Sequence, residues 1–208
     1  MHPNPAFRQT PQELNLLFAR ARGFGTLALN GAAGPLISHI PFVLSGDGRH
    51  AAFHLVRSNP IARALAEGAR DAVLAISGPQ GYVSPDWYGS EDQVPTWNYV
   101  AVHLRGPVEL LPQEGLRAHL DALSARFEAD LAPKLPWTAD KMTEGAMERM
   151  MRQIVPARLT IAQIDSTWKL GQNKPETARL GAADGIEAAG LSPEAATLAA
   201  LMRATDPA

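Results

Sequence analysis

The chain contains no cysteine, and this absence excludes several kinds of chemistry. Disulfide frameworks, thiolate nucleophiles and thiolate metal sites all need cysteine side chains. The sequence also lacks any apolar run near the ~20 residues that a membrane-spanning helix needs. Its first residues lack the charged and apolar segments of a secretory signal. We therefore expect a soluble protein of the cytoplasm.

The short motifs of the common enzyme classes are missing as well. There is no G-x-S-x-G, Walker A or G-x-G-x-x-G segment, so hydrolase, NTPase and dinucleotide-binding functions have no motif to support them. The six histidines form no H-E-x-x-H pattern. His50 and His54 share a face of an expected strand but lie about 13 Å apart at the usual rise. We predict no metal site.

The charge of the chain is nearly balanced. Its formal net charge is −2, so bulk charge gives no support to nonspecific binding of nucleic acid. Hydrophobic residues make up 46% and charged residues 19%, which is typical of a globular protein. The 208 residues are enough for one domain with a substantial core, or for two small domains.

Strand patterns dominate the first half of the chain and helix patterns the second. Thr10 and Pro11 predict a helix start, and Gly23 predicts its end. The expected strands cover residues 24–29, 36–44, 50–56, 71–77, 100–111 and 157–164. Further helices are expected from residue 59, over 114–129 and 139–152, and twice within 175–208. The sequence thus predicts a mainly β protein with helices (α+β).

The segment from Gly78 to Tyr99 is the least ordinary part of the sequence. It contains three prolines, two tryptophans and all three tyrosines of the chain, and we expect a loop here. An ordered loop rich in aromatic residues is often functional. Flat rings beside hydroxyl and amide groups suit a planar heteroaromatic ligand. The alternative is a loop held in place by its own aromatic side chains.

A possible phosphate site lies where the strand 50–56 ends. Arg57, Ser58 and Asn59 follow the strand, and Pro60 suits the first position of a helix. Helix N-termini and arginine side chains both favour phosphate. The alternative is that Asn59 only caps the helix and Arg57 is a solvated charge.

Five segments together resemble the PaiB-type family of FMN-binding negative transcriptional regulators. They are His39-Ile40-Pro41-Phe42, His54 to Pro60, Gly78 to Tyr88, Val94 to Tyr99, and Lys169-Leu170-Gly171-Gln172-Asn173. Their order and spacing fit the family from about Pro5 to Leu180. Two departures stand out: Thr167-Trp168 where the family usually has a lysine, and Gly171 where it usually has serine.

The resemblance implies an FMN-binding split β-barrel, similar to pyridoxamine-phosphate oxidases, that forms a homodimer. From the pattern along the chain we expect this barrel domain to cover residues 1–174, with residues 175–208 as a helical C-terminal appendage of the same domain. The resemblance also implies FMN as cofactor, with Arg57 to Asn59 at its phosphate. The cofactor-binding residues implied by the matching motifs are His39, His54, Arg57, Ser58, Asn59, Ser84, Trp87, Tyr88, Thr96, Trp97, Asn98, Lys169, Gln172 and Asn173.

Three functions remain open at this point. The resemblance favours a flavin-binding negative regulator of transcription. An FMN-dependent oxidoreductase with a nicotinamide reductant is the second, and a flavin-free interaction protein is the third. Direct DNA binding has little support from charge. The segment 175–208 has two basic residues, Arg179 and Arg203, against five acidic ones, which are Glu176, Asp184, Glu187, Glu194 and Asp206.

Overall fold

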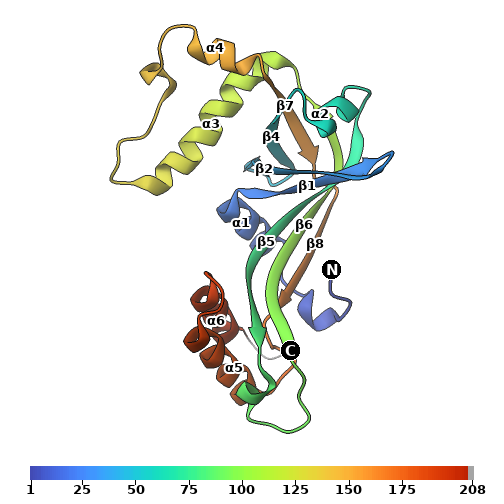
Figure 1. Ribbon diagram of the computed structural model, residues 1–208, viewed down its shortest axis with the longest axis vertical. Helices are drawn as coiled ribbons and strands as arrows, with labels where there is room; N and C mark the ends of the chain where they lie inside the picture. Colours follow the sequence, from blue (N-terminus) through green and yellow to red (C-terminus); the bar gives the residue numbers. More distant parts are fainter. Residues whose placement is uncertain (206–208) are drawn as a thin grey trace. The chain divides into compact units, whose positions relative to one another are not determined.

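The protein is described by a computed structural model over residues 1–205 (Figure 1). Its strands are β1 Phe24–Gly31, β2 Gly34–Pro41, β3 Val43–Leu44, β4 His50–Val56, β5 Arg70–Val83, β6 Thr96–Leu110, β7 Ile154–Thr160 and β8 Gln163–Lys169. Its α-helices are α1 Gln12–Arg22, α2 Pro60–Leu65, α3 Leu116–Glu128, α4 Ala146–Met151, α5 Glu176–Ala189 and α6 Ala195–Ala204. Short 3-10 turns are η1 Pro5–Phe7, η2 Pro85–Tyr88, η3 Gln113–Gly115, η4 Ala129–Leu131 and η5 Ala139–Lys141.

The strands form an eight-stranded sheet whose order differs from the order of the sequence. The order is β2-β1-β5-β6-β7-β4-β3, and β8 pairs with β6. The β1–β2, β1–β5, β3–β4, β4–β7 and β6–β7 pairings are antiparallel. The expectation of a mainly β protein with helices is therefore confirmed.

The chain divides into two compact units. Unit 1 comprises residues 1–15 and 77–102 together with the described residues from 165 onward. Unit 2 comprises residues 16–76 and 103–164. Both units are assembled from segments far apart in the sequence. The division into residues 1–174 and 175–208 stays a prediction, and residues 206–208, including Asp206, lie outside the described part.

Unit 2 has its core on one face of alternating strands. In β1, Leu27 and Leu29 are buried, while Thr26 and Ala28 are partly exposed. Phe53 on β4 is likewise fully buried. Helix α3 contacts β3, β4 and β7, and Figure 1 shows it beside β4 and β7. Every second side chain of these strands therefore faces the core, because successive side chains of a β-strand point to opposite faces of the sheet.

The β1–β2 turn falls between the expected strands 24–29 and 36–44, and both strands extend toward it. Asn30 and Gly31 are paired with Pro35 and Gly34 in the ladder. Residues 32 and 33 make the turn. A two-residue connection is the commonest hairpin geometry, and it extends both strands.

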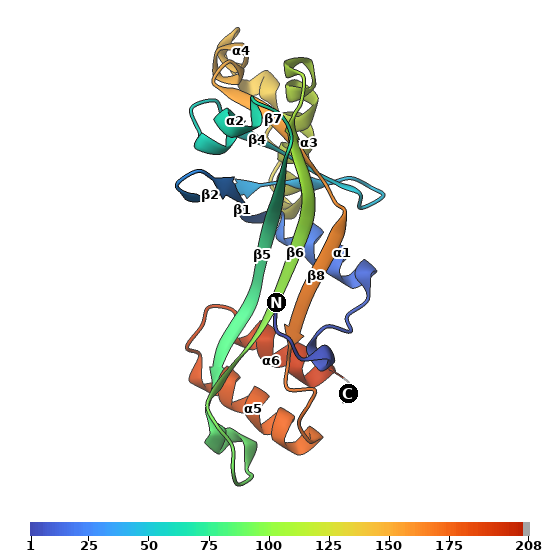
Figure 2. The same cartoon turned by 90° about the vertical axis from the view of Figure 1, so that its right-hand side faces the viewer.

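Unit 1 contains the C-terminal helices, which lie side by side in Figure 2. Helix α5 packs on η2 through small residues. A Cβ atom at Gly185 would lie 2.3 Å from the Trp87 ring, and one at Gly181 would lie 2.5 Å from the Trp87 carbonyl oxygen. The two predicted helices of the segment after Pro175 are therefore present, and Gly190 ends the first.

Several predicted boundaries were wrong. Strands β5 and β6 extend into the segment expected to be a loop, so the connection between them is only residues 84–95. The helix expected over 139–152 is reduced to α4, because Gly145 directly before it has φ +72° and cannot continue a right-handed helix. The strand expected over 157–164 is divided between β7 and β8. Within residues 1–205, no helix has both the length and the hydropathy for crossing a membrane.

Candidate functional site

Arg57 in unit 2 is an exposed cation with a fixed direction. Its Nε donates to the Arg152 carbonyl oxygen at 2.9 Å, and its Nη2 donates to Gln113 Oε1 at 2.5 Å. Gln113 is fixed in turn, because its Nε2 donates to the carbonyl oxygens of Met151 and Ile154. Among residues 1–205, no carboxylate pairs with Arg57. The positive charge of the guanidinium is therefore not neutralised by these residues and is available to bind an anion.

Asn59 caps helix α2, as the alternative interpretation predicted. Its Oδ1 accepts from the Ile61 N–H at 2.8 Å, and its Nδ2 donates to Ser38 Oγ at 3.1 Å. Pro60 at the first helical position has no N–H. The start of this six-residue helix therefore offers little to a phosphate. Ser58 is exposed beside it, so Arg57 and Ser58 are the groups that remain available.

The two predicted histidines of unit 2 have different surroundings. His54 Nδ1 lies 3.2 Å from Nε2 of His119 on α3. Burial lowers the pKa of His54, and burial together with the neighbouring His54 lowers the pKa of His119 to about 4. His39 is exposed on β2, where its Nδ1 lies 3.1 Å from Thr26 Oγ1 on β1. His54 is thus held inside the packing of α3, whereas His39 faces outward.

Unit 1 presents a pair of exposed aromatic rings. Trp97 on β6 is 53% exposed and Tyr82 on β5 is 37% exposed. Their ring centroids are 6.4 Å apart, and their planes make an angle of 75°. Exposed aromatic surface of this kind favours contact with another apolar or planar group.

Two lysines of unit 1 lie against aromatic rings and neutral acceptors. Lys169 donates to Thr96 Oγ1, and its Nζ is 6.0 Å from the centroid of the Phe7 ring. Lys174 donates to Gln93 Oε1 at 2.6 Å, and its Nζ is 5.2 Å from the Tyr88 centroid. Burial, and secondarily the charge of Lys174, lowers the pKa of Lys169. Within the described residues, neither lysine forms an ion pair with a carboxylate.

Four other predicted residues of unit 1 are engaged by the protein itself. Trp87 packs against α5 at Gly185. Tyr88 is buried, which raises the pKa of its hydroxyl. Asn98 is 1% exposed and its Nδ2 lies 3.5 Å from the Met202 sulfur. Gln172 donates to the carbonyl oxygens of Ala6 and Trp168 and accepts from the Leu170 N–H.

The remaining predicted residues are less constrained. Asn173 is exposed, and Ser84 is half-buried before η2 without a side-chain bond that caps it. In unit 1, Tyr82, Trp97 and Asn173 are therefore exposed, whereas Thr96, Lys169 and Lys174 are half-buried.

Comparison with known proteins identifies the family. Residues 1–163 match the family described as "Putative FMN-binding domain". The chain belongs to this family. FMN is accordingly its cofactor, and the predicted family and cofactor are confirmed.

The chain also resembles a curated relative in sequence and several solved structures in fold. The chain is 30% identical over 173 residues to "Protease synthase and sporulation protein PAI 2" of Bacillus subtilis, covering 82% of each chain. It is similar in fold to the conserved hypothetical protein Rv2991 of Mycobacterium tuberculosis, with a TM-score of 0.58, 15% identity, and coverage of 84% of this chain and 94% of that one. The FAD and heme binding protein of Mycobacterium smegmatis gives a TM-score of 0.54 and 20% identity, covering 79% and 73%. The predicted split-barrel fold is confirmed.

The side chains described above fit the chemistry of FMN. The phosphate needs cations that no carboxylate neutralises, and Arg57 in unit 2 is one. Unit 1, taken by itself, has exposed aromatic surface at Trp97, on which a planar group could pack. FMN supplies the hydride and electron chemistry of any reaction that it supports.

Sequence reasoning missed the residues that fix these groups. Gln113 lies 56 positions from Arg57, and His119 lies 65 positions from His54. No local pattern connects residues so far apart, because only the folded sheet brings them together.

Proposed function

We propose that this FMN-binding protein acts as a negative regulator of transcription. Its support is the family and the 30% identity to a Bacillus subtilis protein named for protease synthase and sporulation. Its cytoplasmic location and its homodimeric state are part of the same proposal. The flavin-free alternative is not retained, because the family assigns FMN.

The proposed phosphate contacts of the cofactor lie in unit 2. They are the side chains of Arg57 and Ser58, which are both exposed. The main support for this phosphate site is the fixed orientation of the Arg57 guanidinium. The side chain that holds it, Gln113, is neutral, so the positive charge of Arg57 is not compensated.

Titration with FMN tests this assignment. We expect saturable quenching of flavin fluorescence by the purified protein, and at least tenfold weaker binding by Arg57→Ala. Arg63→Ala is the matched control, because Arg63 is exposed on α2 only six positions away. Equal losses in both variants would indicate a general charge effect. No quenching at tens of micromolar FMN by a folded protein would overturn the flavin site itself.

The C-terminal helices give no support to direct DNA contact. Arg179 is buried and donates to the carbonyl oxygens of Met202 and Arg203. Arg203 pairs with Asp184 at 2.7 Å and with Glu187 at 2.6 Å. Both basic side chains of this segment are thus engaged inside unit 1. We propose that repression acts through a partner or a bound metabolite.

A DNA-binding assay at several salt concentrations separates these routes. We expect weak retardation of a defined promoter fragment, with a shallow dependence of affinity on salt. A protein that contacts several phosphates would instead lose affinity steeply, about 10³-fold or more between 50 and 200 mM salt for six contacts. Such a slope would assign direct repression to a surface other than α5 and α6.

The exposure of Trp97 favours an FMN-dependent oxidoreductase as a second candidate. A nicotinamide reductant needs accessible surface on which its planar ring can pack, and Trp97 and Tyr82 provide exposed aromatic surface in unit 1. Bleaching of the flavin absorbance by NADH or NADPH under anaerobic conditions would support this function. A flavin that stays oxidised with both reductants would favour the regulator.

A further inference from the structure

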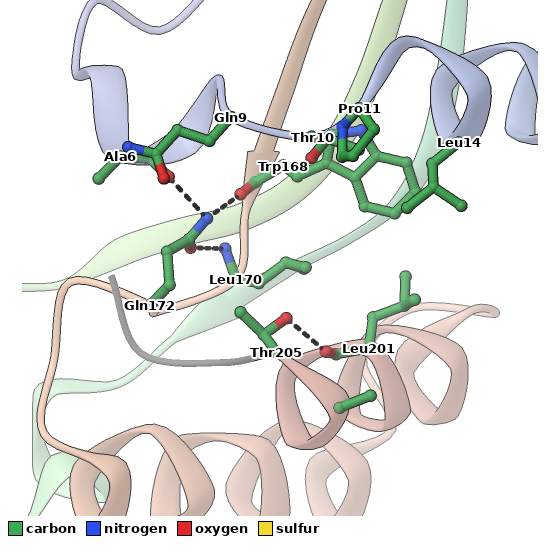
Figure 3. Close-up of a pocket in the computed structure, with 11 residues that line it drawn as sticks. Ala6, Gln9, Thr10, Pro11, Leu14, Trp168, Leu170, Gln172, Leu201 and Thr205 are labelled. Carbon is green, nitrogen blue, oxygen red and sulfur yellow. Dashed lines mark hydrogen bonds between the residues drawn. The ribbon is translucent and has the colours of Figure 1, made fainter.

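We propose that unit 1 contains a second ligand site, a pocket that takes an uncharged aromatic small molecule. The pocket has a volume of about 460 Å³ and lies where the N-terminal segment, the end of β8 and the end of α6 meet (Figure 3). Small-molecule sites usually measure ~300–1,000 Å³. All residues that line it belong to unit 1.

The lining of this pocket defines the polarity of its ligand. Apolar surface comes from the Trp168 indole and from Pro11, Leu14, Leu170 and Leu201. No charged side chain occurs among its described lining residues. A phosphate or carboxylate would therefore lose its hydration without gaining a counter-charge. This excludes the phosphate end of FMN and selects an uncharged molecule.

The walls of the pocket are fixed before any ligand arrives. Asn15 is 4% exposed, its Oδ1 accepts from Trp168 Nε1 at 2.8 Å, and its Nδ2 donates to the Thr10 carbonyl oxygen at 3.1 Å. Gln172 is held by three backbone groups, as Figure 3 shows for Ala6, Trp168 and Leu170. A pocket with rigid walls binds without the entropy loss of ordering side chains.

Few polar groups in the lining are left for the ligand. The hydroxyl of Thr205 donates to the Leu201 carbonyl oxygen, and Gln172 has no donor left. Within the described residues, the side chains of Gln9 and Thr10 form no hydrogen bond with the protein. The ligand that fits has aromatic rings for the apolar wall and one or two hydrogen-bonding groups for Gln9 and Thr10.

The test uses two fluorescent probes that share one ring system. N-phenyl-1-naphthylamine is uncharged, and 8-anilino-1-naphthalenesulfonate carries an added sulfonate. We expect the uncharged probe to bind saturably with a Kd on the order of 10 µM, and the anionic probe to bind at least tenfold more weakly.

Substitutions at the end of α6 locate the site. Ala204→Trp fills the pocket and is expected to weaken the uncharged probe at least tenfold. Ala200→Trp is the matched control, because Ala200 is exposed on the same helix and does not line the pocket. Equal effects of both variants, or no saturable binding by the folded protein, would overturn the proposal.

A charge at the rim gives a second, independent readout. Leu14→Lys places a cation at the pocket and is expected to weaken the uncharged probe and strengthen the anionic one. Leu17→Lys on the same helix, also exposed and outside the lining, should change neither. Unchanged preference in Leu14→Lys would contradict the assignment.

The same assay distinguishes this pocket from the flavin site. Binding of the uncharged probe is expected to persist in saturating FMN, and Ala204→Trp is expected to leave FMN affinity within twofold. Displacement of the probe by FMN would make the pocket part of the flavin site and end the proposal.

Discussion

At the scale of single residues, Gln113 determines whether the positive charge of Arg57 is available to an anion. Its neutral Oε1 accepts from the guanidinium and leaves the charge uncompensated. In Gln113→Glu, a carboxylate would pair with Arg57 and compete with the phosphate of FMN. We expect about tenfold weaker FMN binding by fluorescence titration, a difference of about 1.4 kcal/mol. Gln12→Glu on α1 makes the same charge change at an exposed position and should leave the affinity within twofold.

The His54–His119 pair makes the stability of the protein sensitive to acid. Burial lowers the pKa values of both rings, and the neighbouring His54 adds to the effect on His119, whose pKa falls to about 4. Between this value and ~6.5 the unfolded chain binds more protons than the folded one, so stability falls as the pH falls through this window. Since both rings are only partly buried, we expect a loss of about 1–2 kcal/mol between pH 7 and pH 4.5.

Urea unfolding at these two pH values measures the effect. His119→Leu is expected to lower stability at pH 7 by about 1 kcal/mol, because the hydrogen bond to His54 is lost. The loss on acidification should be smaller in this variant than in the parent protein. Parallel pH profiles for the two proteins would refute the role of this histidine pair.

At the scale of elements, the packing of Trp87 against α5 requires glycine at positions 181 and 185. A Cβ at Gly185 would lie 2.3 Å from the indole, so the helix and η2 can approach only because glycine stands there. Alanine normally stabilises a helix by about 1 kcal/mol over glycine. We nevertheless expect Gly185→Ala to destabilise the protein by about 1–3 kcal/mol, because overpacking outweighs propensity. Thermal unfolding measures this effect.

Gly115→Ala provides the comparison for that variant. A Cβ at Gly115 would meet no atom within 4 Å, and the residue has φ −78°, which alanine adopts without strain. We expect no loss of stability from this substitution. A similar loss in both variants would contradict the packing argument for Trp87.

At the scale of the whole molecule, the proposed homodimer needs an apolar surface on each copy. Ile37 on β2 is 61% exposed and lies opposite Ala28 of β1, so it presents apolar area on the outer face of the hairpin. We expect light scattering to report a dimer, and Ile37→Asp to shift it toward the monomer. Leu135→Asp, at an even more exposed position in a connecting segment, should not. A monomeric parent protein would contradict the proposed state.

Local patterns in the sequence predicted where most elements lie. Strand-like runs give β1 and β4, and Asn59 with Pro60 gives the start of α2. The extent of β5 and β6 was not predictable, because prolines and glycines around Pro79 and Gly81 weaken strand propensity. Pairing with neighbouring strands overrides that propensity once the sheet forms.

The sequence by itself determined the family, the cofactor and the absence of thiol chemistry, because these depend on residue types in a fixed order. Tertiary structure decided which of the motif residues remain available. The hydrogen bond from Arg57 to Gln113 fixes the guanidinium. Asn98 and Trp87 pack against the C-terminal helices and are not available to a ligand. The pocket beside Trp168 also forms only in the folded chain. Each of these outcomes joins residues far apart in the chain, and only packing in three dimensions specifies such contacts.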